Sequence, residues 1–168
     1  MVPILDDRSL EFISRSPEQT RRVGARLGQL LRGGEVICLQ GPLGAGKTVL
    51  AQGIGRGWGA TTPLVSPSFV LIREHRRPTG DQVLLHVDFY RLEDPQEVLG
   101  LGLEDWLEDP GVVTLIEWPE RAMEILPPER MWIHLEFADT ERRRLLFAAE
   151  GSSYEELLRS FRRAAFGV

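Results

Sequence analysis

The chain has 168 residues, of which 42% are hydrophobic; this excludes an intrinsically disordered chain and allows one α/β domain with a sizeable core. The formal charge of −5 argues against broad electrostatic binding of nucleic acid, because such binding needs a basic face. No apolar run approaches the ~20 residues that span a bilayer, and the mixed, acidic residues 1–11 show no secretory signal. We therefore expect a cytoplasmic protein without membrane contact that folds as a single domain over residues 1–168.

The hydrophobic pattern predicts the following elements in chain order. The expected strands are residues 10–13, 36–39, 69–72, 83–87, 112–116, 131–137 and 144–148, with the last two forming a hairpin around residues 138–141. The expected helices are one that begins at a capping box of Ser16 and Gln19 and ends at Gly33 and Gly34, one over residues 47–56, and a C-terminal helix capped by Ser152 or Ser153. This order predicts a three-layer, P-loop NTPase-like α/β domain with a mixed, mostly parallel sheet of about seven strands.

A phosphate-binding loop is expected at residues 41–48, whose sequence Gly-Pro-Leu-Gly-Ala-Gly-Lys-Thr matches G-x-x-x-x-G-K-[ST] between a strand and a helix pattern. A chance match in a chain of this length is expected in roughly one case in a hundred. Lys47, the only lysine of the chain, should reach the β- and γ-phosphates, and the Thr48 hydroxyl should bind Mg²⁺. The residues expected to bind the nucleotide are Gly41, Leu43, Gly44, Ala45, Gly46, Lys47, Thr48 and Val49. The guanine-reading pattern Asn-Lys-x-Asp is missing from the sequence, which favours ATP over GTP.

Two predicted strands end in a carboxylate, as a magnesium site beside such a loop requires. Asp88 follows the strand at residues 83–87, and Glu117 follows the strand at residues 112–116. Both should lie at the sheet edge that carries the loop. The alternative is that one of them only caps a helix or pairs with an arginine.

Other residues near these strand ends leave more than one interpretation. His86 shares a strand face with Asp88 and could orient it or contact a partner, although a structural role is favoured. Trp118 could stack on the nucleotide or cover the phosphates, or it could be a core aromatic. The hydroxyl- and proline-rich residues 61–68 could close over the γ-phosphate or form an ordinary loop.

Together these motifs resemble one family, TsaE (also called YjeE), the ATPase of bacterial threonylcarbamoyladenosine tRNA modification. The matching segments are the loop G-P-L-G-A-G-K-T, V-S-P-S-F at residues 65–69, H-V-D-F-Y-R-L at residues 86–92 and I-E-W-P-E-R at residues 116–121. The resemblance covers roughly residues 33–126. Ser68 is a small departure, because the family more often has Thr there.

The resemblance implies ATP binding with slow hydrolysis, and it implies Mg²⁺ held by Thr48. It also implies that Asp88 and Glu117 act in metal binding or water activation and that Trp118 supports activity near the nucleotide, with Lys47 as a further catalytic residue. The implied partners are the TsaD and TsaB proteins, on which ATP turnover would reset the complex between modification cycles. TsaD would then perform the transfer to tRNA, which this chain would meet only indirectly.

Two other functions stay open at this point. A small-molecule kinase would use Asp88, in the run Asp-Phe-Tyr after an apolar strand, as its catalytic base. However, the sequence offers no clear arginine-rich lid segment of the kind such kinases carry. A binding module without chemistry would hold ATP only as structural support. The rate and product of ATP turnover distinguish these functions from a partner-dependent ATPase.

Overall fold

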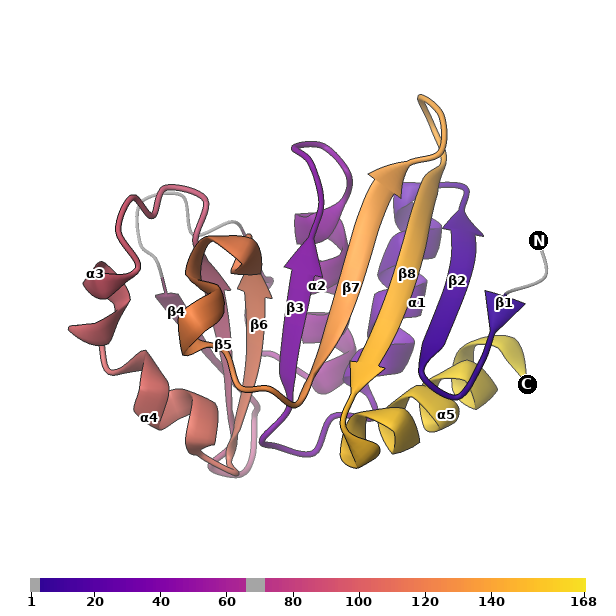
Figure 1. The fold of residues 1–168 in the computed structure, drawn as a ribbon. Helices are drawn as coiled ribbons and strands as arrows, with labels where there is room; N and C mark the ends of the chain where they lie inside the picture. The colour runs from indigo at the N-terminus through magenta and orange to yellow at the C-terminus, as the bar shows by residue number, and fades with distance from the viewer. Residues whose placement is uncertain (1–3, 66–71) are drawn as a thin grey trace.

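The computed structural model describes residues 4–65 and 72–168 (Figure 1). In these ranges the elements are β1 (Ile4–Leu5), β2 (Ser9–Ser14), α1 (Pro17–Gly28), β3 (Val36–Gln40), α2 (Lys47–Trp58), β4 (Ile72–Arg76), β5 (Val83–Asp88), α3 (Gln96–Leu99), α4 (Leu103–Glu108), β6 (Val112–Glu117), the 3₁₀-helix η1 (Pro119–Ile125), β7 (Arg130–Phe137), β8 (Arg143–Glu150) and α5 (Ser152–Phe166). None of the helices in the described ranges is long and apolar enough to cross a membrane.

The strands form one mixed sheet in the order β1-β2-β8-β7-β3-β6-β5-β4. This confirms the predicted α/β class, and the two-residue β1 adds an eighth strand to the seven expected. Parallel pairing is confined to the centre, where β3 lies between β7 and β6, and β6 pairs with β5. The four outer pairings are antiparallel, so the sheet is less parallel than the sequence predicted. For three of these pairings the reason is that short connections between consecutive strands, such as that from β7 to β8, permit only antiparallel pairing.

Helices cover both faces of the sheet and make the predicted three layers. One apolar cluster joins α1, α2 and α5 to one face, with Leu39, Leu50 and Phe161 fully buried in it. A second cluster joins α3, α4 and η1 to the other face around Cys38 and Ile116. In Figure 1, α1 and α2 lie behind the sheet, while α3 and α4 lie beside β4 and β5.

Several predicted boundaries change in the structure. Residues 69–71 of one predicted strand lie outside the described residues, and β4 begins at Ile72. Helix α1 ends at Gly28, before the glycine pair expected to end it. The predicted serine cap of α5 is wrong: Gly151 is the N-cap, and Ser152 is already the first helical residue. Gly151 has a φ of 108°, a left-handed conformation that favours glycine where the chain leaves β8.

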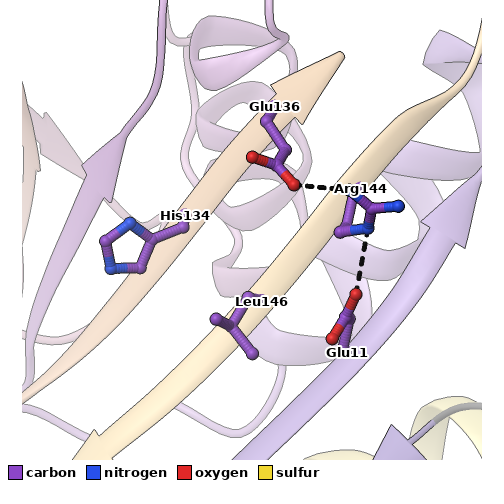
Figure 2. A pocket seen from close by; sticks show the side chains of 5 residues that line it. All are labelled: Glu11, His134, Glu136, Arg144 and Leu146. Carbon is purple, nitrogen blue, oxygen red and sulfur yellow. Dashed lines mark hydrogen bonds and ion pairs between the residues drawn. The ribbon is translucent and has the colours of Figure 1, made fainter. Parts of the chain in front are cut away.

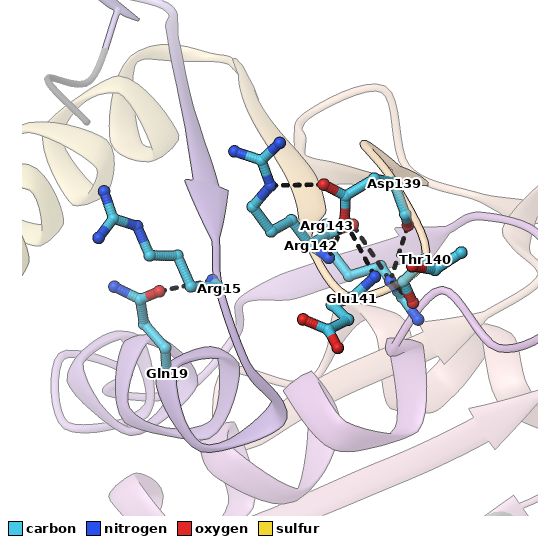
Figure 3. Close-up of polar contacts among 7 residues, drawn as sticks. All are labelled: Arg15, Gln19, Asp139, Thr140, Glu141, Arg142 and Arg143. Atoms are coloured by element: carbon cyan, nitrogen blue, oxygen red, sulfur yellow. Dashed lines mark hydrogen bonds and ion pairs between the residues drawn. The ribbon is translucent and has the colours of Figure 1, made fainter.

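Two local polar motifs confirm predictions about how elements begin and turn, and Figure 3 shows the Gln19–Arg15 contact of the first and the Asp139 contacts of the second. At the start of α1, Ser16 Oγ accepts a hydrogen bond from the Gln19 backbone N–H, and Gln19 Oε1 accepts one from the Arg15 N–H. In the β7–β8 hairpin, Asp139 Oδ1 accepts from the backbone N–H groups of Glu141 and Arg142. The hydrogen bond from the Arg142 N–H is the main cause that lowers the pKa of Asp139 to about 2.

The Tyr154 hydroxyl links α5 to β3, because it accepts a 2.8 Å hydrogen bond from the Val36 backbone N–H. We expect Tyr154→Phe to lower the free energy of unfolding by about 1–2 kcal/mol, since a buried N–H loses its acceptor. Burial raises the pKa of Tyr154 to about 12, above the value of about 10 in an unfolded chain. The stability from the neutral phenol is therefore complete below about pH 10 and is lost as the pH rises toward about 12.

Urea denaturation at neutral pH and at about pH 11 measures how the Tyr154→Phe change and the rise in pH each alter the free energy of unfolding. The exposed Tyr90→Phe is the matched control and should leave the free energy of unfolding nearly unchanged. A Tyr154→Phe variant as stable as this control would contradict the assigned role of the hydroxyl.

Candidate nucleotide-binding site

The loop between β3 and α2 requires glycine at several positions. Gly44 and Gly46 have φ values of 80° and 101°, in the left-handed region. A Cβ on Gly41 would collide with the carbonyl oxygen of Leu135 on β7. The loop therefore approaches the neighbouring strand closely and turns sharply before α2, as a backbone cradle for phosphate requires.

Backbone N–H groups gather at the mouth of this loop. Those of Gly44, Gly46, Lys47, Thr48 and Val49 donate to no acceptor among the residues that the structure describes. The N–H of Ala45 donates to the carbonyl of Pro42 at 3.1 Å, so the loop itself uses this amide. The remaining donors lie at the N-terminus of α2, where the helix dipole favours an anion.

Lys47 lies across the loop with only 5% of its surface exposed. Its Nζ donates to the carbonyl oxygens of Gly41 and Pro42, the latter at 2.9 Å, and lies 4.3 Å from the centroid of the Trp118 ring. Burial lowers the pKa of Lys47, against the charges of Glu117, Glu120 and Asp88, which raise it. Two loop carbonyl oxygens thus accept hydrogen bonds from the ammonium group, which the motif assigns to phosphate oxygens when a nucleotide is bound.

A chain of short contacts connects α2 to the ends of β6 and β5. Thr48 Oγ1 donates to Glu117 Oε1 at 3.0 Å, and His86 Nε2 lies 2.6 Å from Glu117 Oε2. Asp88 pairs in register with Glu117, and its Oδ1 accepts a hydrogen bond from the Tyr90 N–H. Because β6 lies between β3 and β5, Glu117 lies between the loop and Asp88. His86 therefore contacts Glu117; an orienting role toward Asp88 was one of the interpretations that the sequence left open beside the favoured structural role.

Trp118 has an unusual backbone conformation for its position. Its φ of 58° is the only positive value of a non-glycine residue in the described chain. Such a conformation costs roughly 1–3 kcal/mol and persists mainly at functional sites. The half-buried ring packs partly against the core, faces Lys47 on one side and lies 5.0 Å from the Tyr90 ring. Trp118 is therefore an edge residue of the core that also covers the loop lysine, while its contact with a nucleotide stays a prediction.

Sequence reasoning missed the surroundings of Trp118. The Arg121 guanidinium lies 5.5 Å from the Tyr90 ring and 5.4 Å from the Trp118 ring. A cavity of about 320 Å³ lies next to them, lined by Gly41, Trp118 and Glu120 among others. Tyr90, Glu120 and Arg121 all fall within the motifs at residues 86–92 and 116–121, which was the available signal. Residues 66–68 of the predicted closing loop lie outside the described residues, so that hypothesis stays a prediction.

A sequence model of the family described as "Threonylcarbamoyl adenosine biosynthesis protein TsaE" matches residues 14–145. The chain belongs to the TsaE family. The family is one of tRNA threonylcarbamoyladenosine biosynthesis, and the matched span includes the loop, both strand-end carboxylates, His86 and Trp118.

Individual TsaE proteins and a solved structure agree with this membership. The tRNA threonylcarbamoyladenosine biosynthesis protein TsaE of Nostoc sp. is 48% identical over 119 residues, 68% of this chain and 71% of the relative. The protein of the same description from Bacillus subtilis is 36% identical over 150 residues, 89% of this chain and 92% of the relative. The crystal structure of Bacillus subtilis YdiB, 30% identical, aligns with a TM-score of 0.79 over 97% of both chains.

A second cavity of this TsaE-family chain, of about 330 Å³, lies on the face of β2, β8 and β7 (Figure 2). Arg144 pairs there with Glu11 at 3.0 Å and with Glu136 at 2.6 Å, so the one arginine of the lining faces two carboxylates and leaves no excess positive charge for an anion. The described residues contain no group of three or more His, Cys, Asp or Glu side chains placed to hold a metal. The loop before α2 is therefore the better candidate for a polyphosphate.

Proposed function

We propose that this chain binds ATP with Mg²⁺ and hydrolyses the nucleotide slowly, in support of tRNA threonylcarbamoyladenosine modification. The observation that carries the proposal is the convergence of Lys47, Thr48 and Glu117 at the N-terminus of α2. Family membership supports the assignment to this modification pathway, and the geometry of the loop supports the binding of a nucleotide. We further propose that the chain acts on the TsaD–TsaB pair in the cytoplasm and meets tRNA only through that complex.

The residues present fit a magnesium–triphosphate group. The free N–H groups and the Lys47 ammonium would hold the phosphate oxygens, and the Thr48 hydroxyl and Glu117 Oε1 would hold the metal, with Asp88 next to them. Bound Mg²⁺ supplies charge neutralisation across the β- and γ-phosphates. Glu117 and Asp88 are the two side chains that could orient the attacking water, and Trp118 would exclude other water from beside Lys47.

Replacing Glu117 by Gln tests the catalytic part of the proposal, because it keeps the side-chain size and removes the charge. We expect ADP release by the chain with the TsaD–TsaB pair to fall by roughly 10²-fold, the usual effect of losing a group that acts on the proton or on developing charge. ATP affinity, measured by calorimetry, should change much less. The matched control is Glu124→Ala on η1, an exposed carboxylate in the same region, which should keep wild-type turnover.

The same assay separates the competing functions. Transfer of phosphate to a small hydroxyl acceptor at about 1–100 per second would replace the proposal by a small-molecule kinase. A wild-type chain that binds ATP yet releases no ADP above background, even with the partner pair, would instead be a binding module. Wild-type turnover in Glu117→Gln would refute the proposed role of Glu117 in ATP hydrolysis.

A further inference from the structure

We propose that His86 is a positioning residue for Glu117: its imidazole holds one carboxylate oxygen so that the other faces Thr48 and the phosphate loop. The inference rests on the proposed function, because Glu117 has its role there. It adds a residue that does not itself touch the nucleotide and assigns it an effect on turnover rather than on nucleotide affinity.

The two oxygens of the Glu117 carboxylate are divided between two partners. Oε2 lies 2.6 Å from His86 Nε2, and Oε1 accepts the Thr48 hydroxyl hydrogen bond at 3.0 Å. The His86 side chain is 0% exposed and that of Glu117 is 3% exposed, so water does not compete for the contact between them. A carboxylate accepts hydrogen bonds, so the proton of the shorter contact is carried by Nε2.

This division matters because the last torsion of a glutamate side chain is soft. Rotation about that bond has broad, roughly two-fold minima, so an unheld carboxylate samples many orientations. Hydrogen bonds to opposite oxygens remove this freedom, and in a buried setting a charge-assisted bond is strong. The lone pairs of Oε1 are then fixed in direction toward the start of α2 before any nucleotide arrives.

The polar contacts of the imidazole favour this role over a purely structural one. A buried polar ring costs free energy unless it is hydrogen-bonded, and the His86 contact in the described structure is the one to Glu117. Its Nδ1 is buried with no hydrogen-bond partner among the described residues. An apolar side chain would fill the same space without leaving a buried nitrogen unsatisfied. Packing alone therefore does not account for a histidine at this position.

His75 provides a matched control on the neighbouring strand β4. It is also buried, at 5% exposure, and its Nε2 also lacks a partner in the described part of the chain. Its Nδ1 lies 3.0 Å from Thr62 Oγ1, so its hydrogen bond leads away from Glu117. A general effect of disturbing a buried histidine would appear at both positions, whereas positioning of Glu117 would appear only at His86.

The experiment compares His86→Asn with His86→Gln in the chain bound to the TsaD–TsaB pair. The amide of Gln reaches about as far as Nε2 and can still donate to Glu117, whereas the amide of Asn is too short. We expect His86→Asn to lower kcat for ADP release by roughly 10–100-fold, the usual effect of removing a partner of a metal-site ligand. KM for ATP should change little, and His86→Gln should recover part of the loss. His75→Asn should keep the wild-type kcat.

A double mutant isolates the pathway through Glu117. In a Glu117→Gln background, His86→Asn should cause little further loss of kcat, because the group that it positions is already inactive. A full additional loss there, or a wild-type kcat in His86→Asn, would overturn the inference. Failure of the wild-type chain to release ADP would instead refute the proposed function. Thermal unfolding of each variant shows whether a lower kcat is caused by unfolding of the protein. His86→Gln keeps the test valid if His86→Asn does not fold.

Discussion

Lys47→Ala is expected to weaken ATP binding by about 10²–10⁴-fold while the protein stays folded. The motif assigns Lys47 to the β- and γ-phosphates, and two charge-assisted hydrogen bonds contribute about 1.5–3 kcal/mol each. Without nucleotide, Nζ is satisfied by the carbonyl oxygens of Gly41 and Pro42. Binding therefore exchanges two neutral acceptors for charged ones, and the alanine variant cannot make that exchange. Calorimetric titration with Mg²⁺–ATP measures the loss.

The control for this change is Arg56→Ala, which removes an exposed cation from the same helix and should leave ATP affinity unchanged. The urea midpoint of Lys47→Ala should drop only modestly, since two loop carbonyls lose one donor at about 1 kcal/mol each. Unchanged ATP affinity in Lys47→Ala would refute the assignment of the loop, whatever the behaviour of the other variants.

The parts of the site that follow from sequence are those fixed by local chain geometry. A buried strand that runs into a glycine-rich loop and a helix leaves few choices for where Lys47 and Thr48 lie. The ends of parallel strands meet at one edge, so Asp88 and Glu117 could be expected beside that loop. The structure brings these residues together because β3, β6 and β5 are neighbours in the sheet.

The contact of His86 with Glu117 could not be predicted in the same way. The two residues are 31 positions apart in the sequence, and which carboxylate lies nearer to His86 depends on strand order and register. Helices α3 and α4 were also missed, because four and six residues are too few to display a helical period. Residues 89–111, between β5 and β6, were therefore assigned no structure, although Val98 and Leu103 of these helices pack in the cluster on one face of the sheet.

The sequence predicted a helix over residues 47–56, and Gly57, a poor helix former, follows that range. The structure continues the helix to Trp58, and Gly53 and Gly57 face α1 at close range. A Cβ on Gly24 of α1 would lie 2.7 Å from the Leu50 carbonyl oxygen, and Cβ atoms on Gly28 and Gly57 would collide with backbone of the opposite helix. Tertiary packing thus overrides local propensity, and it does so in the helix that carries the phosphate loop.

Gly28→Ala is accordingly expected to lower the free energy of unfolding by about 3 kcal/mol, the upper end of overpacking penalties. The new methyl would meet the Ile54 carbonyl, which is backbone and cannot rotate away. This cost should exceed the gain of about 1 kcal/mol that alanine normally brings to a helix interior. Urea denaturation measures the change.

The matched control is Gly100→Ala, because a Cβ there lies 3.9 Å from its nearest neighbour and the φ of −74° suits any residue. We expect that variant to stay within about 0.5 kcal/mol of the wild type. Since the first turn of α2 bears Lys47 and Thr48, separation of α1 from α2 should also weaken ATP binding in Gly28→Ala. If Gly28→Ala proved as stable as Gly100→Ala, the close approach of the two helices would be refuted, and with it the account of why α2 tolerates its glycines.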